Sequence, residues 1–322
     1  MDLKLAETRA FIEQGDDFLL TTHVNSDADG LPACLALMRL LRGAGKRADV
    51  GLPDPLANQC YFLDDWDQVY HHADLDLPSY RCIVIADCPT ISRIGPVQDG
   101  LGAGVRILNI DHHHDNDHFG ELNLIGELSS TCELVYHLAI GLGHEIDDAM
   151  AAQLYTGIIF DTGGFRFSLT KPSTFEAAAD LVRKGVRLDH IADHVFGNKS
   201  LDSVKQRGLA IKSLKLHLDN RVAVLHLNLK DMRAGDPEEA ANYGLMVKGV
   251  EVAVLLKEQE PNRYRISLRS RDTVDVSAVA SIFGGGGHNR AAGLRLEGEA
   301  ADIIDKILAE TGRQLDRGPS CT

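Results

Sequence analysis

Acidic and imidazole side chains recur in four short segments, and each segment directly follows an apolar run. They are HVNSDAD at 23–29, Asp87 after CIVIA, DHH at 111–113, and DTG at 161–163 after YTGIIF. If each run is a strand of one parallel sheet, these side chains meet at its carboxyl edge, where open α/β sheets bind ligands. Several carboxylates crowded at one edge repel each other unless cations neutralise them. The spacing therefore predicts a metal centre.

The ligand types narrow the choice of metal. Carboxylates and imidazoles without thiolates suit Mn²⁺ better than Ca²⁺ or a structural Zn²⁺ site, with Mg²⁺ or Co²⁺ as substitutes. The number of ligands predicts two ions, and two metals that share a carboxylate suit displacement at phosphorus. Taken singly, each segment also has a structural explanation, since an aspartate can cap a helix and DTG can form a tight turn. Their ordered recurrence favours the metal.

The elements that must position these side chains alternate between strand and helix patterns. Strands are predicted at 18–23, 48–53, 82–88 and 105–113, and helices at 31–45, 130–142, 147–159 and 172–184. This alternation predicts a doubly wound parallel sheet of the α/β class.

The second half predicts a smaller α/β domain with a mixed sheet. Strand patterns occupy 221–227, 251–260 and 263–270. A short turn at Pro261 and Asn262 joins the last two, which predicts an antiparallel hairpin. A polar, helical segment separates the two halves. The predicted divisions are a catalytic domain at 1–188, a helical linker at 189–216 and a nucleotide-binding domain at 217–316.

Four consecutive glycines, Gly284 to Gly287, precede His288 and Arg290. Such a run costs chain entropy, and its bare backbone can approach a ligand closely. The segment is either a flexible hinge or a clamp whose amides and His288 hold a phosphate or base. Arg269 and Arg93 are candidate bidentate phosphate ligands, although Arg269 could equally be an exposed charge on a strand.

The composition limits the partners. With 33 Lys plus Arg against 47 Asp plus Glu, the net charge of −14 disfavours a long nucleic-acid duplex. No signal-peptide pattern and no apolar run of membrane-spanning length is found, which predicts a cytoplasmic protein without a membrane partner. The six cysteines form no CxxC pair and are predicted to be buried thiols.

Taken in order, HVNSDAD, IADCPT, IDHH and FDTGGFRFS resemble the four motifs of the DHH phosphoesterase superfamily. FGGGGHNRAAG resembles the signature of its DHH-associated C-terminal domain, and together these matches span residues 23 to 293. Among subfamilies, the chain is similar to the bifunctional nanoRNase and pAp-phosphatase group, because DTGGFRFS, LRS at 268–270 and GGGGH occur together.

The resemblance implies a role for each motif residue. One metal would be held by His23, Asp27 and Asp87, and the other by Asp29, Asp87, His112 and Asp161. Asp111 would orient a motif histidine, and His113 would face the scissile phosphate. Substrate would be bound by Arg93, Arg269, Gly285, Gly286, Gly287, His288 and Arg290.

The activity implied by the resemblance is manganese-dependent hydrolysis of short oligoribonucleotides or 3′-phosphoadenosine 5′-phosphate (pAp). Hydroxide held by two metals would attack phosphorus in a cleft between the domains. Three alternatives remain: a phosphodiesterase for cyclic or linear dinucleotide messengers, a pyrophosphate or polyphosphate hydrolase, and a catalytically silent nucleotide-binding regulator. GGGGH in place of a lysine-rich signature disfavours the second, and the complete ligand set disfavours the third. Chain-length preference and cleavage direction stay open, and a homodimer is compatible with the sequence.

Overall fold

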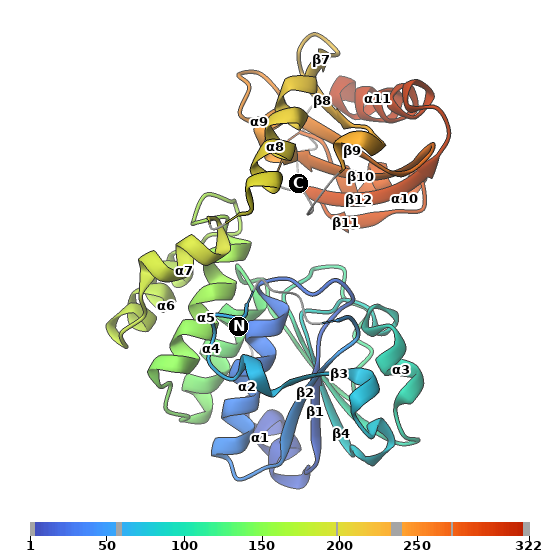
Figure 1. Cartoon of the computed structure of the whole chain (residues 1–322). Coiled ribbons are helices and arrows are strands. Elements are labelled where there is room, and N and C mark those ends of the chain that lie inside the picture. Colours follow the sequence, from blue (N-terminus) through green and yellow to red (C-terminus); the bar gives the residue numbers. More distant parts are fainter. Residues whose placement is uncertain (1–3, 56–59, 198, 233–239, 272, 318–322) are drawn as a thin grey trace. The chain divides into compact units, whose positions relative to one another are not determined.

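The structure is a computed structural model that describes residues 4–55, 60–197, 199–232, 240–271 and 273–317 (Figure 1). The chain forms two compact units, Met1–Asn198 and Lys199–Thr322. Each unit contains a six-stranded sheet. The predicted fold class, a parallel α/β sheet followed by a mixed one, is confirmed.

The sheet of the first unit has the order β3-β2-β1-β4-β5-β6, and all its pairs are parallel. Its strands are β1 (Phe18–Thr21), β2 (Ala48–Leu52), β3 (Val69–His71), β4 (Cys82–Ala86), β5 (Arg106–Asp111) and β6 (Leu122–Ile125). The strand order reverses between β1 and β4, which is the point at which doubly wound sheets bind ligands. Sequence patterns missed β3 and β6, because VYH and LNLI lack the continuous apolar run that marks the central strands.

Helices cover both faces of this sheet. They are α1 (Leu5–Gln14), α2 (Gly30–Gly43), α3 (Pro96–Gly100), α4 (Thr131–Leu142), α5 (Asp148–Asp161), α6 (Pro172–Arg183) and α7 (Leu188–Val195). Figure 1 shows α2, α4 and α5 on one side of the strands and α3 on the other. Both α6 and α7 pack against α5.

Side chains alternate between two cores along the central strands. In β1, Phe18 and Leu20 belong to the core under α2, α4 and α5, whereas Leu19 belongs to the core on the opposite face. In β4, Val84 and Ile85 divide in the same way. Successive strand residues point to opposite faces, so a sheet covered on both faces needs the continuous apolar runs seen in the sequence.

The sheet of the second unit has the order β11-β12-β10-β9-β8-β7 and is mixed. Its strands are β7 (Lys215–His217), β8 (Val222–Leu227), β9 (Val252–Glu260), β10 (Arg263–Ser270), β11 (Gly286–His288) and β12 (Ala291–Glu297). Only the β8 and β9 pair is parallel among its described pairs. The predicted antiparallel hairpin of β9 and β10 is confirmed.

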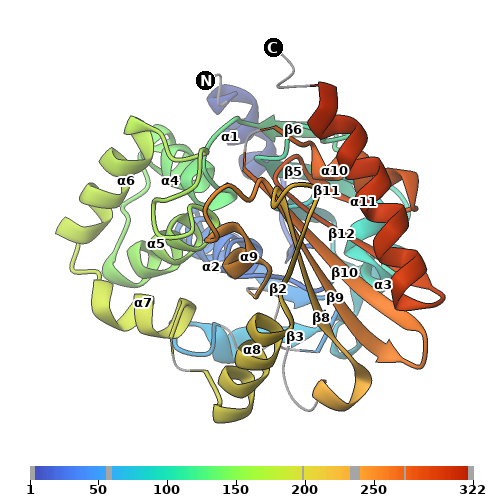
Figure 2. The same cartoon turned by 90° about the horizontal axis from the view of Figure 1, so that it is seen from above.

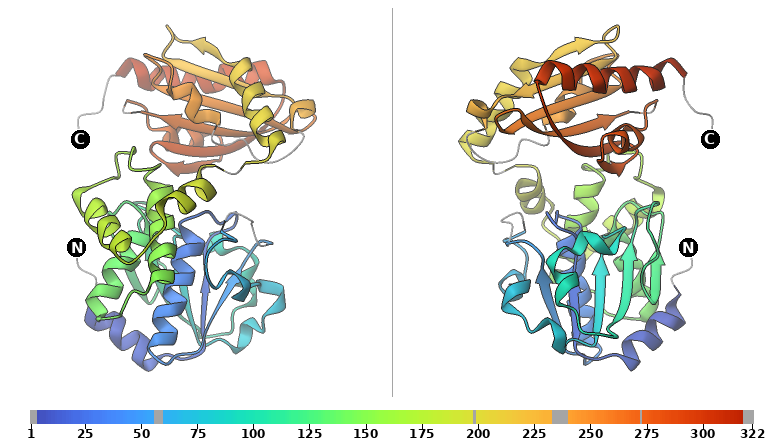
Figure 3. Two further views of the ribbon diagram at one scale, coloured as in Figure 1. Left: turned by 60° about the vertical axis from the view of Figure 1, so that its left-hand side comes forward. Right: turned by 90° about the vertical axis from the view of Figure 1, so that its right-hand side faces the viewer.

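Helices also flank this second sheet on both faces. They are α8 (Leu201–Ser213), α9 (Ala240–Leu245), α10 (Val276–Ile282) and α11 (Ala300–Arg317). One core contains side chains of α10 and α11, and a separate core contains those of α8 and α9. Figure 2 shows α11 on the opposite side of the strands from α8 and α9, and Figure 3 shows α11 running across the sheet.

The segment predicted as a helical linker, 189–216, contains most of α7, then α8, and then the start of β7. The two compact units meet in the chain between α7 and α8. No helix in the described ranges is long and apolar enough to cross a membrane. Cys34, Cys60, Cys82, Cys88 and Cys132 are buried free thiols, as predicted, while Cys321 lies outside the described residues.

A fully buried carboxylate, Glu133, joins the starts of α4 and α6. Its Oε2 accepts hydrogen bonds from the backbone N–H (3.1 Å) and hydroxyl of Ser129 and from Thr174 Oγ1 (2.9 Å). Ser173 Oγ donates to Oε1 at 2.8 Å. Burial acts to raise the pKa of Glu133, but His137 and these donors lower it to about 2. The carboxylate is therefore ionised and fully partnered.

We predict that Glu133→Ala lowers the free energy of unfolding by about 2 to 4 kcal/mol, because it leaves buried hydrogen-bond donors without an acceptor. The folded-state pKa lies below the ordinary 4.5, so this stabilisation is present above 4.5 and is lost as the pH falls toward 2. Denaturant unfolding of wild type and variant across this range measures it. The exposed Glu176→Ala in α6 is the control. A pH-independent difference, or one as small as the control's, would contradict the prediction.

Candidate metal centre

The loops at the carboxyl ends of three strands supply most of the candidate ligands. His23, Asp27 and Asp29 lie between β1 and α2, and Asp87 directly follows β4. DHH begins at the last residue of β5. The side chains meet at the carboxyl edge of the sheet, as the spacing predicted, and the structure adds that the strand order reverses there.

Asp161 does not follow a strand, and that part of the prediction is wrong. It is the last residue of helix α5, which packs against α2, α4, α6 and α7. The preceding YTGIIF run is apolar because α5 is enclosed by other helices, and a short apolar run cannot by itself distinguish a buried strand from a buried helix.

The structure brings all six predicted metal ligands together. Their nitrogen and oxygen atoms form groups in which all atoms lie within 4.8 Å of one another. The groups are His23, Asp27 and Asp87; Asp29, His112 and Asp161; and Asp87, His112 and His113.

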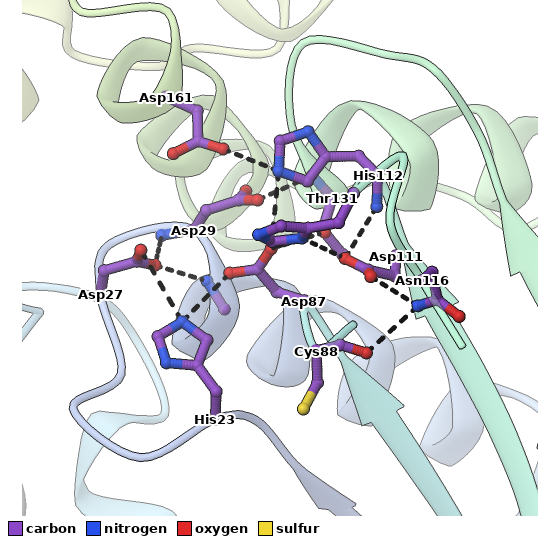
Figure 4. A network of polar contacts seen from close by, with 12 residues as sticks. His23, Asp27, Asp29, Asp87, Cys88, Asp111, His112, Asn116, Thr131 and Asp161 are labelled. Carbon is purple, nitrogen blue, oxygen red and sulfur yellow. Dashed lines mark hydrogen bonds and ion pairs between the residues drawn. The ribbon is translucent and has the colours of Figure 1, made fainter. Parts of the chain in front are cut away.

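Asp87 lies between two of these groups (Figure 4). Its Oδ2 is 3.5 Å from Nε2 of His23, and its Oδ1 is 3.6 Å from Nε2 of His112. The residue has φ +55°, which few non-glycine residues adopt. Such local strain is typical of functional sites. Here it aims one carboxylate at two histidines.

Both histidines present the same ring nitrogen to the carboxylates. Nδ1 of His23 is 2.8 Å from the carbonyl oxygen of Val24, and Nδ1 of His112 is 3.3 Å from that of Leu128. Because a carbonyl oxygen only accepts hydrogen bonds, each Nδ1 carries a hydrogen. In the neutral ring this leaves the Nε2 lone pair free to bind a metal ion, which is how backbone partners orient metal-binding histidines.

Helices α4 and α5 hold the carboxylate of Asp29. It accepts hydrogen bonds from the backbone N–H groups of Thr131 (2.7 Å) and Cys132 (3.0 Å). Thr131 Oγ1 also donates to Asp87 at 3.1 Å. A β-carbon at Gly157 would lie 2.3 Å from Asp29 Oδ1, so only glycine lets α5 approach this closely. Sequence patterns did not identify Thr131 or Gly157, because both contacts depend on how the helices pack.

A second buried network orients His113. Nδ1 of His113 lies 2.7 Å from Oδ1 of the fully buried Asp111. Asn116 donates to the other oxygen of Asp111 at 2.6 Å and to the carbonyl of Cys88 at 3.2 Å. The network therefore ties DHH to the residue after Asp87. Asn116 was missed, although it lies within the polar run that DHH begins.

The charges of this cluster fit divalent cations. Burial raises the pKa of Asp161 to about 6, and burial and neighbouring carboxylates raise the pKa of Asp29 well above its ordinary value. Although burial acts to lower it, nearby carboxylates also raise the pKa of both His23 and His112. Without a metal the cluster would hold extra protons, which cations can replace.

The predicted substrate residue Arg93 belongs to the first unit. It lies in a short 3₁₀ helix, η4 (Ile91–Ile94). Its carbonyl oxygen accepts a hydrogen bond from the backbone N–H of Val24 at 2.7 Å. Arg93 is thus tied to the segment that carries His23.

The other predicted substrate residues lie together at one corner of the second sheet. Arg269 in β10 is paired with Ala291 in β12, which is paired with His288 in β11. The guanidinium of Arg290 donates to the carbonyl of Val274 at 3.3 Å. The side chain of His288 lies outside the described residues.

The fold explains three of the four consecutive glycines. Gly284 has φ +75° after α10. A β-carbon at Gly285 or Gly287 would lie 2.3 Å or 2.5 Å from a backbone oxygen of β12. At Gly286 a β-carbon would meet no described atom within 4 Å. Because Gly286 lies in a paired strand, a free hinge is disfavoured there, and no contact within the described fold requires its missing side chain.

Comparison with known proteins identifies the family. Residues 17–158 match "DHH family, N-terminal domain", and residues 219–314 match "DHHA1 domain". A bifunctional oligoribonuclease and PAP phosphatase NrnA from Thermus thermophilus is 32% identical over 305 residues, which cover 92% of this chain and 90% of that protein. The chain belongs to the DHH family. Its members are phosphoesterases, so the predicted enzyme class, a hydrolase of phosphoester bonds, is confirmed.

Other similar proteins cover the chain of this DHH-family protein almost completely. The Bacillus subtilis protein of the same name is 26% identical, over 92% of this chain and 93% of its own. A solved structure, of an exopolyphosphatase-related protein from Bacteroides fragilis, has a TM-score of 0.90 and 23% identity, and covers 97% of this chain and 96% of its own. The latter shows a shared fold.

We predict that metal binding to this DHH-family chain releases protons and tightens as pH rises. The raised pKa values of Asp29, Asp161, His23 and His112 mean that a divalent ion must displace protons. Calorimetric titration of Mn²⁺ into metal-free protein, in buffers of different ionisation enthalpy between about pH 6 and about pH 8, measures both effects. The account would be contradicted if the affinity did not change with pH and no protons were released.

Proposed function

We propose that this protein hydrolyses short oligoribonucleotides and pAp, using two divalent ions of which Mn²⁺ is the preferred one. The observation that carries the proposal is the position of Asp87, with one oxygen facing His23 and the other facing His112. Relatives named bifunctional oligoribonuclease and PAP phosphatase NrnA, at 26 to 32% identity over most of the chain, support this substrate class.

Under this proposal His23, Asp27 and Asp87 hold one ion. Asp29, His112 and Asp161 hold the other and share Asp87 with the first. When bound, two such ions supply an activated water and positive charge beside the phosphoryl oxygens. The amides of α4 and the bare Gly157 keep Asp29 in place.

His113 is proposed as the general acid among the protein's side chains. Asp111 holds Nδ1, so the ring orientation is set and Nε2 is the nitrogen that can act on substrate. Although burial acts to lower it, Asp111 and Asp87 raise the pKa of His113. A protonated His113 can stabilise negative charge on a phosphoryl oxygen or protonate the leaving oxygen.

The corner formed by Arg269, Gly286 and Arg290 is proposed to bind substrate in the second unit, and Arg93 is proposed as a phosphate ligand in the first unit. Arginines pair with phosphate oxygens bidentately, and the open side of Gly286 lets a ligand approach the backbone. With a net charge of −14, the chain favours a short substrate over a long duplex.

We predict that Asp87→Ala removes both ions, whereas Asp27→Ala weakens one site, because only Asp87 faces both histidines. Metal analysis after dialysis should give near-zero Mn²⁺ for the first variant and an intermediate content for the second. The exposed Asp115→Ala, in the loop after DHH, is the control. Chelation should abolish hydrolysis, and Mn²⁺ should restore it. An Asp87→Ala protein that keeps two ions would refute the proposal that both ions share Asp87.

We predict that pAp and diribonucleotides are hydrolysed at least about 10-fold faster, in kcat/KM, than a strand of about 20 nucleotides. Gly286→Ala should raise KM for the short substrates and leave the melting temperature unchanged, since a methyl group fits the fold there. Gly208→Ala, at another open position in the second unit, is the control. Preference for the long strand would refute the proposal, and preference for a cyclic dinucleotide would favour the messenger phosphodiesterase instead.

A further inference from the structure

The loop that follows Asp161 forms a tight turn at the end of α5. Gly163, Gly164 and Phe165 have consecutive positive φ values of 57°, 71° and 63°. The backbone N–H groups of Arg166 and Phe167 both donate to the carbonyl of Thr162, at 2.9 and 3.0 Å. The main chain of Phe167 is thus anchored to the residue adjacent to Asp161.

The ring of Phe167 is anchored at its far edge as well. A β-carbon at Gly163 would lie 2.4 Å from Cζ of Phe167, so the tip of the ring occupies the space that any other residue at 163 would fill. The guanidinium Nε of Arg166 donates to the carbonyl of Gly163 at 2.6 Å and holds the turn. The tip of the Phe167 ring therefore lies over the backbone of Gly163, two residues after Asp161.

Yet the Phe167 side chain is 47% exposed. The other aromatic side chain of the loop behaves differently, since the ring of Phe165 stacks on that of Phe175, with their centroids 5.1 Å apart. The loop therefore has an internal aromatic contact that Phe167 does not share. An exposed aromatic face that lies close in the chain to the candidate metal ligand Asp161 suits stacking on a ligand.

We propose that Phe167 is a platform on which a nucleobase of the substrate stacks while the attached phosphate lies at the metal centre. The inference rests on the proposed function, and it gives a base-binding role to Phe167, a residue of the FDTGGFRFS segment to which the sequence analysis assigned no role. A nucleobase is favoured over another apolar ligand because the main chain of Phe167 is bonded to Thr162, the residue next to the candidate metal ligand Asp161. Stacking on an aromatic side chain tolerates every base, which suits a protein that acts on oligonucleotides of mixed sequence.

Binding of adenosine 5′-monophosphate (AMP) and ribose 5-phosphate to the full-length Mn²⁺-loaded protein tests the proposal, because the two ligands differ by the base. Calorimetry should show that the wild type binds AMP more tightly. Phe167→Ala should weaken AMP binding by about 5-fold to about 150-fold, the range found for lost stacking, and should change ribose 5-phosphate binding less than about twofold. Phe167→Trp should keep the affinity for AMP, whereas Phe167→Leu should not.

Ile140→Ala is the matched control, since Ile140 is 51% exposed near the opposite end of α4 from the metal centre. It should bind both ligands as the wild type does. Equal loss of both ligands in Phe167→Ala, no loss of either, or full affinity in Phe167→Leu would each overturn the proposal. Hydrolysis of a diribonucleotide by the same samples separates the two claims: base-dependent binding without hydrolysis would support the platform and refute the proposed function.

Discussion

The structure of the first unit depends on keeping several acidic side chains close together in a buried place. Asp29, Asp87 and Asp111 are almost inaccessible to solvent, and buried carboxylates are costly unless they are protonated, hydrogen-bonded or paired with cations. Each of these three carboxylates is stabilised by different partners. Backbone amides of α4 hold Asp29, two histidines face Asp87, and Asn116 and His113 hold Asp111. Contacts within the protein therefore position all three carboxylates.

The parallel sheet makes this arrangement possible. Neighbouring parallel strands end at the same edge, so β1, β4 and β5 carry residues far apart in the chain to one place. The helices complete the centre from the side. Gly157 lets α5 approach Asp29, and Glu133 joins the start of α4 to that of α6, whose preceding loop carries Phe167. The packing of the helices around the centre therefore also sets the positions of its ligands.

The second unit offers a different kind of surface, in which backbone rather than carboxylates is exposed. Gly285 and Gly287 are needed by the pairing of β11 with β12, whereas Gly286 is not. Adjacent glycines of one run can therefore differ in whether the fold needs them, since successive strand residues point to opposite faces. This division among adjacent glycines cannot be read from the letters GGGG.

Sequence alone determined the chemistry and its approximate place: the ligand types, their order after apolar runs, the parallel sheet and the hairpin around Asn262. These follow from local patterns, because periodicity and residue type act within a few positions of the chain. Tertiary structure decided that the helix predicted at 147–159, rather than a strand, carries Asp161 to the centre, that Thr131 and Gly157 support Asp29, and that Asn116 holds Asp111. These contacts join distant segments, and only the packing of helices against the sheet creates them.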